Sequence, residues 1–172
     1  MDMQFVVKLI ADGMVVPVAL IGAYTLLRYA YTLLRYVPAA ERYHTYTKVM
    51  MAGLSSYVLA KIVGLLYQPA TLRPFELMGV DAGASFLDNP GFPSDHALFT
   101  MAITLAILFG AKKKTWALVA VIMTLLVGVG RVIALVHTPL DVVGGLIIAC
   151  AGIFWYLPIS QKSRTEASGK SA

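Results

Sequence analysis

Residues 116–141 read WALVAVIMTLLVGVGRVIALVHTPLD, an apolar run that ends among three polar side chains, Arg131, His137 and Asp141. The run from Trp116 to Gly130 has no charged side chain and is typical of a membrane-spanning helix that extends into its flanking residues. The three polar side chains then lie at the rim of the membrane. Arginine there can clamp a phosphoryl group, and histidine can act as a nucleophile or proton donor. This stretch predicts a helical membrane protein with a phosphate site at one surface.

The composition of the whole chain agrees with this interpretation. Of its 172 residues, 59% are hydrophobic and 13% are charged, and the mean hydropathy is +0.76, whereas an ordinary soluble domain has about 25% charged residues. At about 20 residues per span there is no room for a separate soluble domain. We expect one all-α transmembrane domain over residues 1–160 and a disordered cytoplasmic tail over residues 161–172. The single cysteine, Cys150, is expected to be a packing residue.

Apolar runs bounded by charge or proline predict a bundle of five transmembrane helices. They cover residues 14–36, 49–67, 97–111, 116–130 and 140–157. Residues 1–12 are predicted to form a short interfacial helix, because their apolar side chains share one side. Residues 23–29 and 30–36 repeat the same seven amino acids, AYTLLRY. Seven residues are close to two helical turns, so the repeat is expected to lengthen the first span by roughly 10 Å with little change of face.

Lysine and arginine are distributed unequally between the two ends of these helices. One side has Arg28, Arg35, Arg42, Lys48, Lys112, Lys113, Lys114, Lys162, Arg164 and Lys170, and the other has Lys8, Arg73 and Arg131. The positive-inside rule places the larger group, and the C-terminus, in the cytoplasm. The net charge of +5 is then explained by topology, and no nucleic-acid partner is expected. Arg73, His96, Arg131 and His137 are expected to meet on the extracytoplasmic side.

A second polar stretch, Pro93-Ser94-Asp95-His96, opens the third predicted span. Proline and serine suit the start of a helix, where free backbone N–H groups bind anions. Taken alone, Ser94 and Asp95 are equally typical of simple helix caps. After the next span has returned the chain to the same side of the membrane, Asp141 follows His137 by four residues. It can accept a hydrogen bond from one imidazole nitrogen, which leaves the other nitrogen nucleophilic.

These motifs resemble those of the type 2 phosphatidic acid phosphatase family of integral membrane lipid phosphatases. The family pattern is Lys-x6-Arg-Pro, then Pro-Ser-Gly-His, then Ser-Arg-x5-His-x3-Asp. The matching stretches here are 73–74, 93–96 and 130–141, and the resemblance spans roughly residues 49–157. It implies that His137 attacks phosphorus to form a phosphohistidine, that Asp141 orients His137, and that His96 protonates the leaving group and later activates water.

The resemblance also implies a set of phosphate ligands and no cofactor. Arg73, Ser94 and Arg131, with backbone N–H groups near Asp95, would hold the phosphoryl oxygens without a metal. Three positions depart from the pattern: Leu66 stands where the motif has lysine, Asp95 replaces glycine and Gly130 replaces serine. The nearest lysine is Lys61, inside an apolar span where an ionisable residue is costly, so it either serves the phosphate site or forms a structural pair.

Three classes of function fit these observations. The first is a lipid phosphatase. Undecaprenyl diphosphate is the favoured substrate, because some bacterial members of the resembled family that resemble undecaprenyl diphosphate phosphatases also have aspartate at the motif position of Asp95. Phosphatidate and phosphatidylglycerophosphate are the alternative substrates. The second class is a non-enzymatic lipid-phosphate binder or transporter, and the third is a purely structural membrane protein. The expected partners are the substrate and the surrounding membrane lipids. The sequence leaves the oligomeric state open, a homo-oligomer included.

Overall fold

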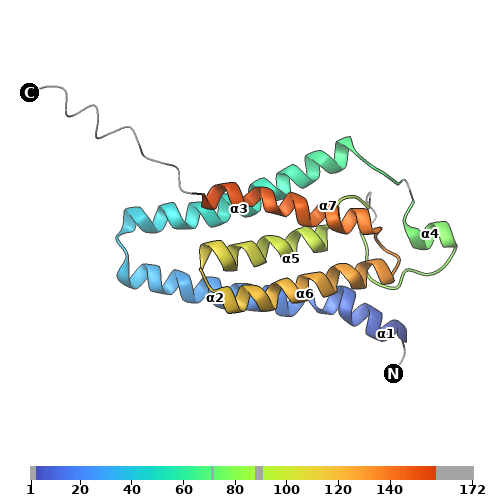
Figure 1. Cartoon of the computed structure of the whole chain (residues 1–172), viewed down its shortest axis with the longest axis horizontal. Helices are drawn as coiled ribbons and strands as arrows, with labels where there is room; N and C mark the ends of the chain where they lie inside the picture. Colours follow the sequence, from blue (N-terminus) through green and yellow to red (C-terminus); the bar gives the residue numbers. More distant parts are fainter. Residues whose placement is uncertain (1–2, 71, 88–90, 158–172) are drawn as a thin grey trace, which may run out of the picture.

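The computed structural model describes residues 3–70, 72–87 and 91–157, without the side chains of residues 40 and 41. These residues form an all-α bundle without strands (Figure 1). The helices are α1 (Met3–Lys8), α2 (Val15–Tyr36), α3 (Ala39–Leu66), α4 (Pro74–Met78), α5 (Asp95–Leu105), α6 (Lys114–Ile133) and α7 (Pro139–Cys150). The π-helical turns Leu9–Gly13 and Ala106–Gly110 follow α1 and α5, and the 3-10 turn Ala151–Tyr156 follows α7. The predicted tail at 161–172 lies outside the described residues.

Among the described residues, four helical segments are long and apolar enough to cross a membrane. They are Met3–Tyr36, Arg42–Leu66, Lys114–Ile133 and Pro139–Tyr156. The span predicted at 97–111 corresponds to the helix Asp95–Gly110, which is apolar but shorter. Its helix α5 lies in the middle of the bundle, packed against α3, α6 and α7 (Figure 1). A helix enclosed by other helices does not need to match the membrane thickness by itself.

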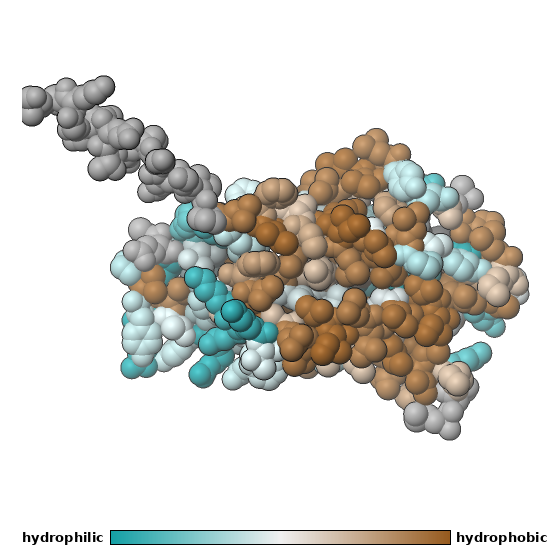
Figure 2. Space-filling view, viewed as in Figure 1, coloured by the Kyte–Doolittle hydropathy of each residue, from teal (hydrophilic) through white to brown (hydrophobic). Residues whose placement is uncertain are grey.

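Large apolar side chains cover the outside of the bundle. Leu27, Leu118 and Ile147 each expose more than 60% of their surface, and brown hydrophobic residues form a broad band across Figure 2. The core is instead rich in small residues, with Ala117 and Ala149 almost completely buried. This arrangement is typical of helices surrounded by lipid, because small residues allow close helix packing while large apolar ones face acyl chains. The protein therefore has the surface of a multi-pass membrane protein.

The short N-terminal helix predicted for residues 1–12 is present as α1 (Met3–Lys8), but it is not separate from the first span. Instead α1 continues through the π-helical turn into α2, and this turn packs against α6. The backbone N–H of Met14 donates to the carbonyl of Leu9 at 3.1 Å, a bond that spans five residues. Pro17 lies just beyond and has no N–H to donate to Gly13. A wider turn at this point accommodates the missing donor without ending the helix.

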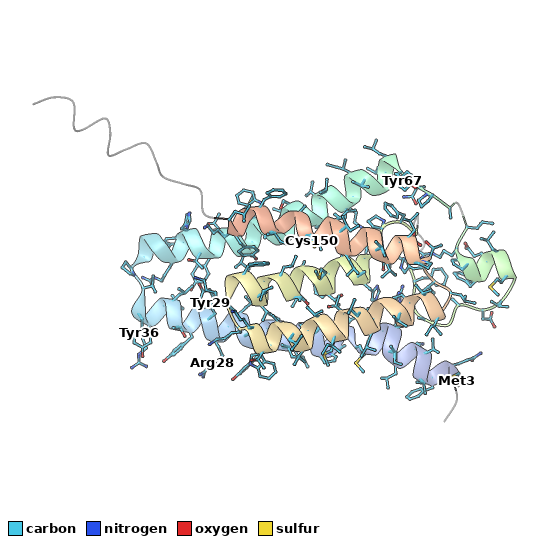
Figure 3. All side chains as sticks on the ribbon, viewed as in Figure 1. Met3, Arg28, Tyr29, Tyr36, Tyr67 and Cys150 are labelled. Carbon is cyan, nitrogen blue, oxygen red and sulfur yellow. The ribbon has the colours of Figure 1, made fainter. Side chains whose placement is uncertain are left out.

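The tandem repeat in α2 is part of the first span, as predicted. Both copies lie within this one helix, whose far end projects with the start of α3 beyond the other helices (Figure 1). The second copy contacts α3, because the Tyr46 hydroxyl donates to the Ala30 carbonyl at 3.1 Å and Arg42 Nη1 donates to the Leu34 carbonyl at 3.2 Å. Figure 3 shows Arg28 pointing away from the bundle, where its charge can reach the membrane surface.

Close packing of α7 on α5 brings the two motif-bearing helix starts together. A Cβ added to Gly145 would lie 2.6 Å from the backbone oxygen of Ser94, so only glycine allows this approach. Farther along α7, Cys150 packs against a buried cluster that contains Leu98 and Ile148, which fits the packing role predicted for it. The starts of α5 and α7 are thus fixed side by side.

Candidate active site

The start of α7 holds the Asp141 carboxylate in a fixed position. Thr138 is the N-cap, Pro139 occupies the first turn, and a capping box joins Thr138 to Asp141. The Thr138 backbone N–H donates to Asp141 Oδ2 at 2.7 Å, and the Asp141 N–H donates to Thr138 Oγ1 at 3.2 Å. The carboxylate is therefore oriented by the helix start itself.

His137 precedes this cap and is 5% exposed. Its Nδ1 lies 3.7 Å from Asp141 Oδ2 and has no hydrogen-bond partner. This separation is too long for a hydrogen bond, although catalytic hydrogen bonds often shorten when substrate binds. Burial lowers the pKa of His137 from its ordinary 6.5; Asp141 opposes the shift, and the guanidinium groups of Arg131 and Arg73 reinforce it. The imidazole is therefore neutral at neutral pH, the form that a nucleophile requires.

Ser94 lies at the start of α5 and is completely buried. Its backbone N–H donates to the Asp141 carbonyl at 2.9 Å, which ties the starts of α5 and α7 together. Its side chain makes no capping hydrogen bond, and Oγ has no partner. Ser94 is therefore not the simple side-chain cap that its position also suggested. Its hydroxyl remains available to a ligand.

Arg73 reaches the same region from the start of α4, a short helix that was not predicted. Its Nη1 donates to the Val136 carbonyl at 2.7 Å and its Nη2 to the Leu87 carbonyl at 3.0 Å, and the residue is 8% exposed. The backbone next to it is also fixed, because Phe75 N–H donates to the Leu135 carbonyl at 3.0 Å. The guanidinium thus lies against the chain segment that carries His137.

Arg131 lies in the last turn of α6 and is 1% exposed. Its backbone carbonyl accepts from the N–H of His137 at 3.3 Å, so the six-residue spacing of the motif closes a turn. Its Nη1 donates to Asp12 Oδ1 and to the Ser85 carbonyl, each at 2.7 Å, while its Nε is buried without a partner. Asp12 was not among the predicted site residues. The signal that could have found it is an acidic residue in a long apolar segment.

Lys61 and Asp95 form an ion pair at the edge of the site. Lys61 Nζ lies 2.9 Å from Asp95 Oδ1 and 3.1 Å from Oδ2, and about a third or more of each side chain is exposed. The lysine therefore reaches the start of α5 directly from α3. Asp95 lies between Ser94 and His96, so this pair adjoins two of the predicted site residues. His96 Nε2 in turn lies 4.0 Å from Asp12 Oδ1.

A cavity of about 740 Å³ opens among α2, α3 and α5 beside these residues. Its wall is mostly apolar and includes Leu26, Met50, Leu54, Phe99 and Ile103. Lys61, Asp95 and His96 line it where these helices reach the site. An apolar cavity with a few polar groups at one end suits a ligand that has a long apolar part and a charged head.

Comparison with known proteins finds one family and three similar curated proteins. The profile of the PAP2 superfamily matches residues 42–165. Undecaprenyl-diphosphatase BcrC of Bacillus subtilis (strain 168) is 35% identical over 100 residues, which are 58% of this chain and 49% of that protein. Undecaprenyl-diphosphatase of Sulfolobus acidocaldarius is 32% identical over 108 residues, or 59% and 50% of the two chains. Bacitracin transport permease protein BcrC of Bacillus licheniformis is 30% identical over 115 residues, or 63% and 54%.

The chain spans about half the length of these curated relatives. No solved structure matches it. The matched region begins in α3 and contains every predicted site residue, whereas Asp12 lies before it. The profile covers more than half of the chain and agrees with the resemblance drawn from the motifs. The chain therefore belongs to the PAP2 superfamily.

Proposed function

We propose that the protein is a membrane lipid phosphatase that removes a phosphate from a lipid phosphate or diphosphate. The observation that carries this proposal is that two residues hydrogen-bonded through their backbones to His137 and Asp141 have unpartnered, buried polar atoms. Arg131 Nε and Ser94 Oγ are both buried without a hydrogen-bond partner, and leaving buried polar atoms unpaired costs free energy. The oxygens of a bound phosphoryl group would satisfy both donors.

The proposed reaction has two steps, which begin with His137. Its Nε2 attacks phosphorus, the bond from phosphorus to the leaving oxygen breaks, and His96 donates a proton to that oxygen. Asp141 stabilises the proton that Nδ1 keeps on the phosphorylated ring. A water molecule, whose proton passes to His96, then attacks phosphorus; the bond between phosphorus and Nε2 of His137 breaks, its electron pair returns to Nε2, and inorganic phosphate leaves. His137 returns to its neutral form.

We propose that this chemistry needs no metal. Charge builds on the equatorial oxygens of the phosphoryl group during transfer, and fixed cations and N–H donors stabilise it. Arg73, Arg131, Ser94 and the backbone N–H groups near Asp95 supply such donors. Lys61 contributes indirectly: its ammonium group pairs with Asp95 and balances the charge of that carboxylate at the edge of the site.

Undecaprenyl diphosphate is the substrate that we favour. Two of the similar proteins are named undecaprenyl-diphosphatase, and the apolar cavity beside His96 suits a lipid chain. We infer that the site faces the extracytoplasmic side, because Lys112, Lys113 and Lys114 lie at the opposite end of the bundle and the positive-inside rule places them in the cytoplasm. Phosphatidate and phosphatidylglycerophosphate remain alternative substrates.

The second candidate is a lipid-phosphate binder or transporter, and one similar protein is named a transport permease. Binding alone needs cations, whereas this site also contains a buried neutral histidine beside a carboxylate held by a capping box. That arrangement favours the enzyme.

Phosphate release from purified protein in detergent separates these possibilities. The assay compares undecaprenyl diphosphate, phosphatidate and phosphatidylglycerophosphate in the presence of EDTA, with His137→Ala as the matched variant. Release by the wild type alone supports a metal-independent phosphatase that acts through His137, and the relative rates rank the lipids. Binding of a lipid without release, by protein that remains folded, would instead support the binder.

A further inference from the structure

Asp12 connects the N-terminal helix to the centre of the candidate site. It lies in the π-helical turn Leu9–Gly13, and 119 sequence positions separate it from Arg131. Its Oδ1 accepts from Arg131 Nη1 at 2.7 Å, and its Oδ2 accepts from the backbone N–H of Ser85 at 2.9 Å. The Ser85 carbonyl accepts from the same Nη1 at 2.7 Å. These three bonds join the carboxylate, the guanidinium and the loop before α5 into one closed arrangement.

The absence of a side chain at Gly130 makes this arrangement possible. A Cβ at position 130 would lie 2.8 Å from the backbone nitrogen and 2.9 Å from the Cα of Ala11. Both atoms belong to the main chain, so a side chain at position 130 would push the whole turn away from α6. Ala11 is completely buried and packs with Ala134 and Val136 on the segment that leads to His137. The replacement of the motif serine by glycine thus allows the N-terminal turn to reach the site.

The contacts of Asp12 determine which edge of Arg131 remains available. Nη1 is held by two acceptors, whereas Nε is buried and has none. A guanidinium binds an oxyanion best through two parallel N–H donors in its plane. The edge formed by Nε and Nη2 offers such a pair. Fixing Nη1 on the carboxylate and the Ser85 carbonyl prevents the group from turning this edge away.

We propose that Asp12 is a positioning residue of the phosphatase site, which holds Arg131 so that its Nε edge meets the phosphoryl group. This inference rests on the proposed function. It adds the N-terminal helix, which lies outside the family match, to the parts of the chain that determine turnover. Asp12 acts through Arg131 and does not itself bind the substrate.

Asp12→Asn is the most direct variant. An amide has one oxygen and one NH₂ group, so it cannot accept from both Arg131 Nη1 and the Ser85 N–H. We expect kcat/KM to fall about 10- to 100-fold, the range seen in metal sites when a group that orients a metal ligand is removed. The concentration of inorganic phosphate that gives half-inhibition should rise as well. Asp81→Asn, which changes an exposed acid of the loop before Ser85, is the control and should leave both values unchanged.

Three outcomes would overturn the positioning role. Tighter inhibition by phosphate with unchanged kcat/KM would mean that Asp12 merely repels anions. A lower melting temperature with unchanged kcat/KM of the folded protein would mean that Asp12 is only a structural tie. The third outcome is an effect of Asp12 that does not depend on Arg131. In an Arg131→Lys background, the further loss of kcat/KM caused by Asp12→Asn should nearly disappear. If the losses of the two single variants multiply in the double variant, the proposal is contradicted.

A second variant and a binding measurement keep the test independent of turnover. Gly130→Ser should reproduce the kinetic effect of Asp12→Asn, because it displaces the turn that carries the carboxylate; wild-type kinetics for Gly130→Ser would count against the proposal. If the wild type releases phosphate from no lipid, the proposed function fails, and thermal stabilisation by inorganic phosphate then tests the positioning. Loss of that stabilisation in both Arg131→Ala and Asp12→Asn supports it, and its retention in Asp12→Asn overturns it.

Discussion

The backbone N–H of Ser94 donates a hydrogen bond to the backbone carbonyl of Asp141 at 2.9 Å. This bond joins the first residues of two helices whose side chains carry different parts of the proposed chemistry. Ser94 offers an unpartnered hydroxyl, and Asp141 lies beside the imidazole of His137. Because the bond uses only main-chain atoms, the side chains can be changed one at a time without separating the helices.

Replacing Ser94 with alanine should separate activity from stability. The buried Oγ has no partner in the free protein, so its removal deletes no hydrogen bond and should leave the melting temperature unchanged or slightly higher. Loss of a donor to the phosphoryl group should lower kcat about 100-fold. Thermal unfolding and phosphate release are measured on the same preparation. A Ser94→Ala protein with normal kcat would show that the hydroxyl does not contact the substrate.

Asp141→Asn should lower kcat by at least about 100-fold, because an amide cannot hold the imidazole in the tautomer that the nucleophile needs. The matched control is Thr138→Ala, which removes the cap bond to the Asp141 N–H but keeps the carboxylate. That variant should cost about 1 kcal/mol of unfolding free energy and change kcat little. Equal kinetic losses in the two variants would mean that Asp141 serves only the helix cap.

Lys61→Met should lower kcat/KM about tenfold, since it leaves the Asp95 carboxylate uncompensated next to a phosphate site. The double variant with Asp95→Asn should recover part of this loss, because the unpaired charge is then gone. The test compares the steady-state kcat/KM of the two single variants with that of the double variant. Normal turnover of Lys61→Met with only a changed melting temperature would assign the lysine a structural role.

The buried His137 should make stability depend on pH in a defined direction. Its pKa lies below the ordinary 6.5 because burial disfavours the charged form. As pH falls below 6.5, the unfolded chain binds a proton before the folded one does, so stability declines with falling pH. Activity should fall on the same side, with the midpoint of the acid limb below 6.5. Melting temperatures of wild type and His137→Gln between pH 7 and pH 5 test this. A difference between them that does not change with pH would contradict it.

The sequence was sufficient to predict the elements that depend on local pattern. Apolar runs gave the helices, and the short run at residues 116–130 extends into its flanks to Lys114–Ile133 as predicted. The motif spacing also predicted that Arg131, His137 and Asp141 lie close together, where a turn joins the end of α6 to the start of α7. Pairings between distant segments could not be predicted in this way. Nothing near Asp12 signals that its partner lies on α6, and the five-residue helix α4 is too short to show a periodic pattern.

The most direct test of the central claim is a search for a phosphorylated His137. Wild-type protein is mixed with undecaprenyl diphosphate labelled at its terminal phosphate, quenched in alkali within a single turnover, and mapped by mass spectrometry. We predict an acid-labile phosphoryl group on His137 that is absent from His137→Ala. Phosphate release by the wild type with no labelled protein at any quench time would mean that water attacks the substrate directly, and would contradict the account.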